Sequence, residues 1–213
     1  MKKIYLLSGL GADHRVFDYL ELSGYHLQHI KWTKPRHKEP IEDYAKRLVS
    51  QIQDQNPILL GVSFGGIMAI EIAKLIKVER IILISSVRTQ REIPFYYRLI
   101  GSLGVNKLMP SFVLKSISPV TYWFFGTMSN SDRQLLKQII IDTDARFLKW
   151  AINIIVNWRN SDQIKELIVI GGSNDRLLPA RNPDYLIEDG GHFMIVNRSS
   201  EISDLIKKIL GRF

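Results

Sequence analysis

The sequence predicts an α/β fold: a mostly parallel six-stranded sheet with helices on both faces and an inserted helical cap. Three observations support this prediction. Short apolar runs rich in isoleucine, leucine and valine alternate with segments whose apolar residues recur at helical spacing. Such alternation is typical of parallel strands, because each strand is followed by a helical crossover. After residue 87 a helical, aromatic-rich stretch interrupts the alternation, and this stretch is too long for a plain crossover.

Three of the six predicted strands lie in the N-terminal part of the chain. Residues 41–52 carry apolar side chains every three or four positions, which predicts an amphipathic helix. The expected elements are a strand over 3–7, a short helix over 17–22, a strand over 26–32, the helix over 41–52 and a strand over 58–62.

The third strand is followed at once by residues 67–76, which are apolar on most sides, as in a helix packed closely on a sheet. The remaining predicted elements are strands over 80–85, 167–170 and 185–188 and an amphipathic helix over 199–210.

Residues 88–160 form the predicted cap. They hold more aromatic residues than one crossover helix would need to cover a sheet. The last helix of this segment, over 145–158, is expected to return to the core. The sequence therefore predicts a core of residues 1–87 and 161–213, with residues 88–160 inserted as a helical cap.

The positive charge of the chain is concentrated in the predicted cap. The formal net charge is +8 at pH 7, and ten lysines and arginines lie between residues 88 and 160 against four acidic residues. This excess indicates either solvated helix faces or a preference for an anionic substrate, partner or surface. No nucleic-acid-binding motif accompanies the charge, so nucleic acid is not an expected partner.

The chain has no cysteine, which excludes disulfides and thiolate metal sites and fits a reducing cytoplasm. Its start, with two lysines before a short apolar run, resembles a signal peptide, but the run reaches only about half of a signal core. We interpret it as the first strand and expect a cytoplasmic protein. No stretch approaches the roughly 20 apolar residues of a membrane span.

The most informative motif is Gly61-Val62-Ser63-Phe64-Gly65, a G-x-S-x-G pattern between the third strand and the following helix. A serine on such a tight turn presents its hydroxyl at the carboxyl edge of the sheet. The two glycines leave room for the turn, where a Cβ would crowd the neighbouring strand and helix. Ser63 is therefore a candidate nucleophile, and the N–H of Phe64 points toward a developing oxyanion.

A nucleophilic serine needs a base, and the base needs an orienting acid. Asp175 follows the fifth strand and His192 follows the sixth, so both are expected at the same sheet edge as Ser63. The chain order serine, acid, histidine is typical of this motif. Asp189 or Glu188 could orient His192 instead, with Asp175 as a turn or helix-capping residue.

These motifs resemble the α/β-hydrolase superfamily over almost the whole chain. The resemblance rests on the loop 7–11, the turn at Ser63, the loop 172–179 and the segment 190–192. The chain starts at the superfamily's third strand, so the resemblance implies six strands and no N-terminal antiparallel hairpin.

The resemblance also implies roles for individual residues. Ser63 would be the nucleophile, His192 the general base and then the acid, and Asp175 the residue that orients His192. The backbone N–H groups of Leu10 and Phe64 would be the oxyanion donors.

Two features depart from the superfamily pattern. Ser8-Gly9 stands where many relatives have His-Gly, which leaves the shape of the oxyanion loop open. Only residues 176–184 separate the acid loop from the sixth strand, so a minimal loop or single turn is expected in place of a helix.

Asp13 and His14 follow the oxyanion loop and would lie at the pocket mouth, although a surface or capping role also fits them. The aromatic cap suggests an apolar acyl- or ring-binding cavity. The pocket candidates are Asp13, His14, Tyr122, Trp123, Phe124 and Phe193. No metal site is expected, because the other histidines lie singly, and His26 and His29 would face opposite sides of a strand.

The sequence thus predicts a serine hydrolase that cleaves a small or medium acyl ester through an acyl-enzyme on Ser63, without a cofactor. A thioesterase, whose anionic acyl carrier would suit the basic cap, or a carbon–carbon hydrolase or lyase could use the same triad. A non-catalytic ligand receptor or scaffold of the same fold is a further alternative. The expected partner is a small-molecule ester or thioester, and the aromatic cap also allows a homodimer.

Overall fold

The computed structural model describes residues 2–104, 110 and 114–211. Its strands are β1 (Lys2–Leu7), β2 (Tyr25–His29), β3 (Ile58–Val62), β4 (Arg80–Ile84), β5 (Leu167–Gly172) and β6 (Tyr185–Ile187). They form one six-stranded sheet in the order β2-β1-β3-β4-β5-β6, and every neighbouring pair is parallel. The predicted six-stranded sheet is therefore confirmed, and within the described residues it is entirely parallel.

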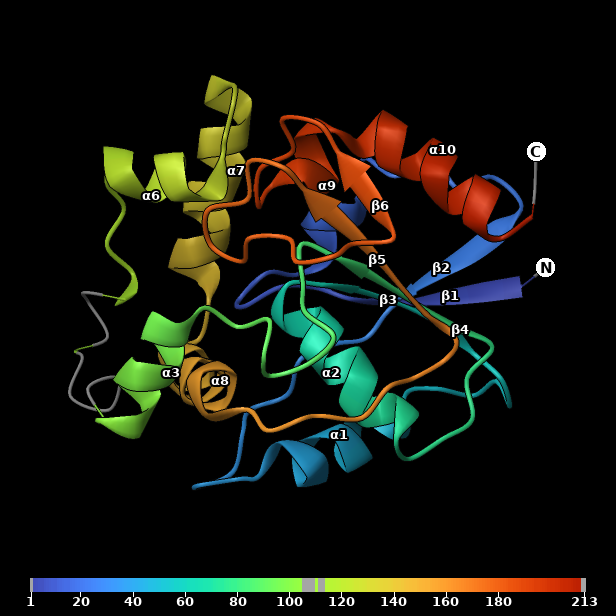
Figure 1. Cartoon of the computed structure of the whole chain (residues 1–213), viewed down its shortest axis with the longest axis horizontal. Helices are drawn as coiled ribbons and strands as arrows, with labels where there is room; N and C mark the ends of the chain where they lie inside the picture. The colour runs from blue at the N-terminus through green and yellow to red at the C-terminus, as the bar shows by residue number, and fades with distance from the viewer. Residues whose placement is uncertain (1, 105–109, 111–113, 212–213) are drawn as a thin grey trace.

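The helices cover both faces of this sheet, as predicted (Figure 1). They are η1 (His14–Phe17), α1 (Ile41–Val49), α2 (Phe64–Ala73), α3 (Phe95–Ser102), α6 (Pro119–Phe125), α7 (Asn130–Asp142), α8 (Ala145–Asn157), α9 (Met194–Asn197) and α10 (Ser199–Ile209). In the view of Figure 1, α1 and α2 lie below the sheet, and α9 and α10 lie above it.

Side chains alternate along the strands between two apolar clusters. Tyr5 and Leu59 belong to the cluster on the side of α1, α2 and α8, whereas Ile4 and Leu60 belong to the cluster on the side of η1, α9 and α10. This alternation follows from the two-residue period of a strand. Both faces are buried, as is usual for a parallel sheet with crossover helices.

Two predicted elements near the N-terminus differ from the structure for identifiable reasons. The helix expected over 17–22 is instead the 3-10 turn η1, which begins after Asp13 because that carboxylate accepts a hydrogen bond from the N–H of Arg15 at 3.0 Å. The strand expected over 26–32 ends at His29. The N–H of Ile30 donates one more hydrogen bond to the carbonyl of Leu6 at 2.9 Å. Because β1 ends at Leu7, the residues after Ile30 have no neighbouring strand to pair with.

Helix α8 and the residue that follows it contribute side chains to the core. Phe147, Ala151 and Trp158 belong to the core cluster on the α2 side. The indole N–H of Trp158 donates to the buried carboxylate of Glu71 on α2 at 2.8 Å. Helix α8 also packs against α3. Residues 105–109 and 111–113 of the predicted cap lie outside the described residues, and the division into core and cap stays a prediction.

The connection between β5 and β6 contains no helix in the described chain, as expected from its length. The carboxylate of Asp184 accepts a hydrogen bond from the N–H of Val169 at 2.7 Å and is paired with Arg88. None of the helices in the described part of the chain has the length and apolarity to cross a bilayer.

Candidate active site

Ser63 occupies a strained turn between β3 and α2. Its backbone has φ 53° and ψ −120°, a conformation that a residue other than glycine rarely adopts. A Cβ on Gly61 would lie 2.5 Å from the carbonyl oxygen of Gly65, and a Cβ on Gly65 would lie 2.1 Å from that of Leu7. Both glycines are therefore required by close backbone approach, which is the role that the motif predicts.

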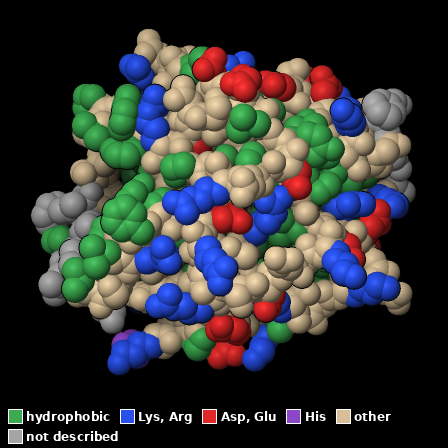
Figure 2. Space-filling view, in the orientation of Figure 1, with side chains coloured by type: hydrophobic (Ala, Val, Ile, Leu, Met, Phe, Trp, Pro, Cys, Tyr) green, Lys and Arg blue, Asp and Glu red, His purple; other side chains and the backbone are tan. Residues whose placement is uncertain are grey.

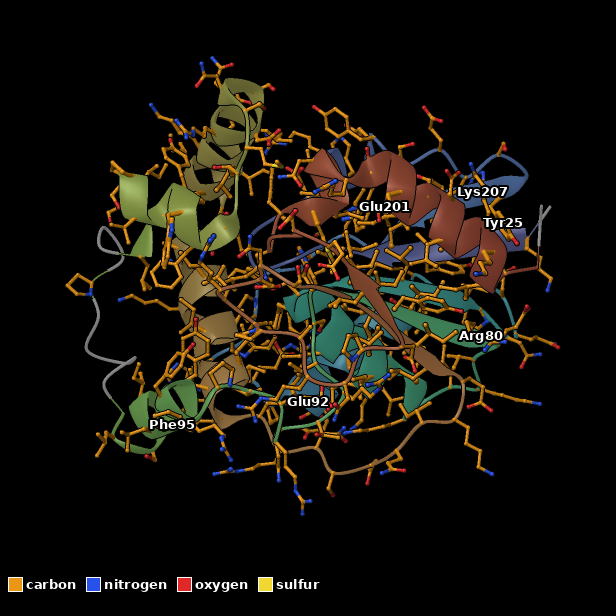
Figure 3. All side chains as sticks on the ribbon, turned by 45° about the horizontal axis from the view of Figure 1, so that its top comes forward. Tyr25, Arg80, Glu92, Phe95, Glu201 and Lys207 are labelled. Atoms are coloured by element: carbon orange, nitrogen blue, oxygen red, sulfur yellow. The ribbon has the colours of Figure 1, made fainter. Side chains whose placement is uncertain are left out.

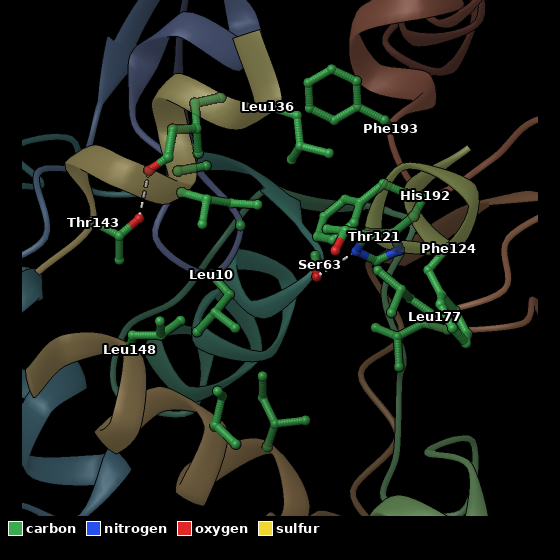
Figure 4. Close-up of a pocket in the computed structure, with 18 of the residues that line it drawn as sticks. Leu10, Ser63, Thr121, Phe124, Leu136, Thr143, Leu148, Leu177, His192 and Phe193 are labelled. Atoms are coloured by element: carbon green, nitrogen blue, oxygen red, sulfur yellow. Dashed lines mark hydrogen bonds between the residues drawn. The ribbon is translucent and has the colours of Figure 1, made fainter. Parts of the chain in front are cut away.

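The structure brings the three predicted catalytic side chains together. His192 Nε2 lies 2.9 Å from Ser63 Oγ (Figure 4). On the other side of the ring, His192 Nδ1 lies 2.9 Å from Asp175 Oδ2. All three residues are buried. An ionised Asp175 accepts the Nδ1–H of the histidine, which leaves Nε2 free to accept the hydroxyl proton of Ser63.

Asp175 is held in place by its own loop. Its Oδ1 accepts hydrogen bonds from the N–H groups of Leu177 at 3.0 Å and Leu178 at 2.9 Å. Glu188 and Asp189, the alternative acids, are exposed. Within the described residues, Asp175 is the carboxylate that contacts His192.

His192 is fixed between the acid loop and α6. The N–H of the following Phe193 donates to the carbonyl of Phe125 at 2.9 Å, and the ring of Phe125 meets the imidazole edge-on with 5.6 Å between centroids. Gly191 packs so closely on Gly126 that a Cβ would lie 2.9 Å from the Gly126 Cα. The histidine is therefore oriented by contacts with the predicted cap as well as with the core.

The predicted oxyanion loop lies against the nucleophile. A Cβ on Gly9 would be 3.4 Å from the Ser63 Cβ, and Leu10 lines the same cavity as Ser63. Among the described residues, no acceptor is found for the N–H of Leu10 or of Phe64. Both N–H groups are thus available for a ligand oxygen, as the resemblance implies.

Ser8 fixes the shape of this loop, which the sequence left open. Its buried hydroxyl donates to the carbonyl of Ala12 at 2.6 Å and accepts the indole N–H of Trp32 at 2.9 Å. His29 Nε2 lies 3.3 Å from the same oxygen. Ser8 is therefore the centre of a hydrogen-bonded group contributed by the loop after β1, by β2 and by the segment after β2.

His29 is neutral in this group. Burial, aided by the nearby His14, lowers the pKa of His29 to about 4. Because the Ser8 proton is directed to Ala12, the Nε2–H tautomer of His29 donates to the Ser8 oxygen.

A cavity of about 700 Å³ opens in front of Ser63 and His192 (Figure 4). Its described lining residues include no charged side chain and are mostly aliphatic or aromatic. Tyr97 also lines it, and burial raises the pKa of this phenol to about 12, so the hydroxyl stays protonated. The cavity is suited to an uncharged apolar group.

The predicted pocket residues separate into three groups. Phe124 and Phe193 line this cavity. Asp13 caps η1 and pairs with Arg15, and His14 lies in η1 with its ring centroid 6.3 Å from that of His29. Tyr122 and Trp123 line a second, smaller cavity on α6.

Most of the aliphatic wall was not identified from the sequence. It comes from α7, α8 and the acid loop, and its members include Leu136, Ile139, Leu148, Ile152, Ile155 and Leu177. The sequence contains one indication of this wall: residues 148, 152 and 155 are spaced so that they lie on one face of the predicted helix. Among the described residues, no group of three or more His, Asp or Glu side chains is arranged to hold a metal ion.

Comparisons with known proteins place the chain by its fold. The model of an uncharacterised protein family, UPF0227, matches residues 14–106, a segment that includes Ser63 and ends before Asp175 and His192. A search of curated proteins gives no significant match.

Solved structures resemble almost the whole chain. A bromoperoxidase from Bacillus anthracis matches with a TM-score of 0.70 at 16% identity, over 99% of this chain and 92% of its own. An esterase (EaEST) from Exiguobacterium antarcticum matches with a TM-score of 0.68 at 16% identity, over 98% and 92%. A thermophilic esterase from Thermogutta terrifontis matches with a TM-score of 0.69 at 16% identity, over 99% and 89%. The chain therefore has the α/β-hydrolase fold.

Proposed function

We propose that the protein is a serine hydrolase that cleaves a small or medium acyl ester. The observation that carries this proposal is the buried hydrogen-bonded series from Ser63 Oγ through His192 to Asp175, with 2.9 Å at each step. This series opens into an apolar cavity of about 700 Å³. The esterases among the structural neighbours support the same class of reaction, although the fold alone does not fix function.

In the first half of the reaction, the Ser63 oxygen bonds to the ester carbonyl carbon while the hydroxyl proton moves to His192 Nε2. The carbonyl electron pair shifts to its oxygen, which the N–H groups of Leu10 and Phe64 stabilise. Removing one donor of this kind typically costs about 2.7–4 kcal/mol in the barrier. The carbon–oxygen bond to the alcohol then breaks, and the alcohol takes the proton from His192.

The second half releases the acid. Water gives a proton to His192 and bonds to the acyl carbon, and the bond to Ser63 breaks as the proton returns to its oxygen. Asp175 keeps the imidazole in the required tautomer and stabilises it when it is protonated.

The apolar cavity is suited to binding the acyl part of the substrate. A charged group in this cavity would lose water without gaining a partner, because no charged side chain is among the described lining residues. An uncharged hydrocarbon chain or ring would gain apolar contact instead.

The decisive test is labelling with a fluorophosphonate probe, run on the wild type, Ser63→Ala and Ser131→Ala, beside a p-nitrophenyl ester series of rising acyl length. Ser131 is exposed on α7 and serves as the control. We expect labelling and turnover in the wild type and in Ser131→Ala, and neither in Ser63→Ala.

An unlabelled but folded wild type would contradict the serine-hydrolase mechanism and favour a ligand receptor or scaffold. Labelling without turnover of any ester would keep the nucleophile and contradict the ester assignment, so thioesters and carbon–carbon substrates would be assayed next.

A further inference from the structure

Helix α6 separates two cavities of different character. Phe124 and Phe125 line the large apolar cavity beside His192. Tyr122 and Trp123 line a second cavity of about 350 Å³, together with two arginines, Arg133 and Arg176. No role is assigned to this second cavity by the triad chemistry.

Both arginines are held over aromatic rings. The Arg176 guanidinium lies 4.4 Å from the ring centroid of Trp123, and its Nη1 donates to the Trp123 carbonyl at 3.0 Å. The Arg133 guanidinium lies 5.6 Å from the ring centroid of Tyr122. Stacking on a ring orients a guanidinium and leaves most of its N–H donors free for another partner.

Neither arginine forms an ion pair with a carboxylate among the described residues. The sequence has no aspartate or glutamate at positions 1, 105–109, 111–113 and 212–213, which lie outside the described residues. Within the described part of the chain, Arg176 Nη2 donates to the neutral side-chain amide of Asn174, at 3.3 Å. The neighbouring acid, Asp132, lies in the first turn of α7, where its carboxylate accepts hydrogen bonds from the N–H groups of Met128 and Ser129. By contrast, Arg15, Arg47 and Arg88 elsewhere in the chain each pair with a carboxylate.

We propose that this second cavity binds a phosphate-bearing ligand. Two guanidinium groups in one cavity match the double charge of a phosphate and can each bond two of its oxygens. The walls of Tyr122 and Trp123 offer apolar surface to the group that carries the phosphate. Figure 2 shows Lys and Arg side chains beside the hydrophobic ones over α6, at the left edge of the molecule.

The two cavities draw different lining residues from the same segments of the chain. The acid loop contributes Arg176 to the small cavity and Leu177 and Leu178 to the large one. The phosphate can therefore belong to the leaving part of the substrate or to a separate ligand that acts through α6. The chemistry at the arginines is the same in both cases.

The binding experiment is calorimetric titration of the full chain with phenyl phosphate, at constant ionic strength set with chloride. The variants are Arg133→Gln, Arg176→Gln and Arg176→Lys, and the control is Arg146→Gln, an exposed arginine on α8. We expect at least a tenfold loss of affinity in both Gln variants and a smaller loss in Arg176→Lys, which keeps the charge without the planar fork.

An unchanged affinity in Arg146→Gln would support the site. No binding to a wild type shown to be folded by thermal denaturation would overturn it, as would an equal loss in the Arg146→Gln control, which would indicate attraction by net charge alone.

Two acyl phenyl esters, one with a neutral leaving group and one with a phosphate on the phenol, distinguish the two sources of phosphate. An increase in KM for the phosphate ester alone in the arginine variants assigns the phosphate to the substrate. A change in neutral-ester turnover on adding phenyl phosphate to the wild type, lost in the variants, assigns it to a separate ligand. Absence of all turnover would count against the proposed hydrolase, whereas the titration would still decide the site.

Discussion

Ser63 holds a backbone conformation that costs free energy in the folded state. Residues other than glycine at such angles are typically strained by about 1–3 kcal/mol. Glycine has no Cβ and relieves this strain, whereas alanine does not. We therefore expect Ser63→Gly to raise the melting temperature above that of Ser63→Ala, with both variants unlabelled by a fluorophosphonate.

Differential scanning calorimetry of the two variants measures this difference. A Ser63→Gly protein that melts at or below the temperature of Ser63→Ala would show that the neighbouring strands do not hold Ser63 under strain.

Ser8 acts on the proposed reaction through the loop that it holds. Ser8→Ala removes the acceptor of the Trp32 indole N–H and the donor to Ala12. The Leu10 N–H would then be less well aligned with the oxyanion, which forms only during reaction. We expect kcat to fall by about tenfold or more, with little change in KM, in steady-state assays with the best ester of the series. Ser50→Ala, at the exposed end of α1, is the control, and an unchanged kcat in Ser8→Ala would contradict this role.

His29 makes stability depend on pH. Its pKa is lowered to about 4 in the folded protein from 6.5, so the unfolded chain binds the proton more readily. The His29 contribution is therefore fully present above about pH 6.5 and is lost as the pH falls toward 4, by roughly 2–3 kcal/mol. Urea denaturation at pH 7 and pH 4.5 should show a smaller decrease in His29→Gln than in the wild type, and equal decreases would contradict the burial of His29.

At the scale of elements, Trp158, which directly follows α8, makes a buried polar contact with α2. The Trp158 indole N–H and the Lys74 ammonium both bond Glu71 Oε1 at 2.8 Å, and the Glu71 side chain is 2% exposed. Trp158→Phe removes one donor from a buried carboxylate, which typically costs about 1–3 kcal/mol. We expect this loss in denaturant unfolding and almost none for Trp123→Phe, whose side chain is exposed. A Trp158→Phe protein as stable as the wild type would mean that water replaces the indole.

The elements that the sequence predicted well are those with strong local signals. The strand over 58–62 is confirmed residue for residue, because Pro57 and the glycine motif limit it at both ends. Helix α2 begins at Phe64, earlier than the predicted residue 67. Gly65 and Gly66 have low helix propensity, so the sequence predicts a later start. Both glycines are nevertheless required in the helix, because a Cβ would collide with Leu7 or Ser86.

The short helix predicted over 17–22 is wrong, because only Phe17 of this segment belongs to a helix, the 3-10 turn η1. In the structure Phe17, Leu20 and Leu22 are buried, but the segment is irregular and is held by a long-range bond from the Glu21 N–H to Ser203 Oγ at 2.9 Å. A contact with a residue so distant in the chain has no local sequence signal.

At the scale of the whole molecule, the three predicted catalytic residues could be placed from the sequence because a parallel sheet brings the ends of its strands to one edge. The cavity walls could not, because they depend on how α6, α7 and α8 cross that edge. Trp123 illustrates the difference: its position on α6 directs it to the arginine-lined cavity rather than to Ser63.

The exposed surface of the predicted cap is apolar at several places. Phe95 on α3 is 69% exposed and lies at the periphery of the molecule (Figure 3), and Leu99 and Leu103 follow it at four-residue spacing. These residues lie on one helix face, because four residues make about one helical turn.

The order of strands in the sheet has a consequence for synthesis on the ribosome. Strands β3, β4, β5 and β6 are added to the same side in chain order, so β4 is the open edge until β5 emerges. Residues 85–166 must be translated first, which at common rates takes roughly 4–16 s. Throughout that interval the nascent chain carries Ile81 to Ile84, wholly buried in the finished protein, on an unpaired edge. Such an edge recruits other strands, so the interval between β4 and β5 is when the growing chain most needs a chaperone.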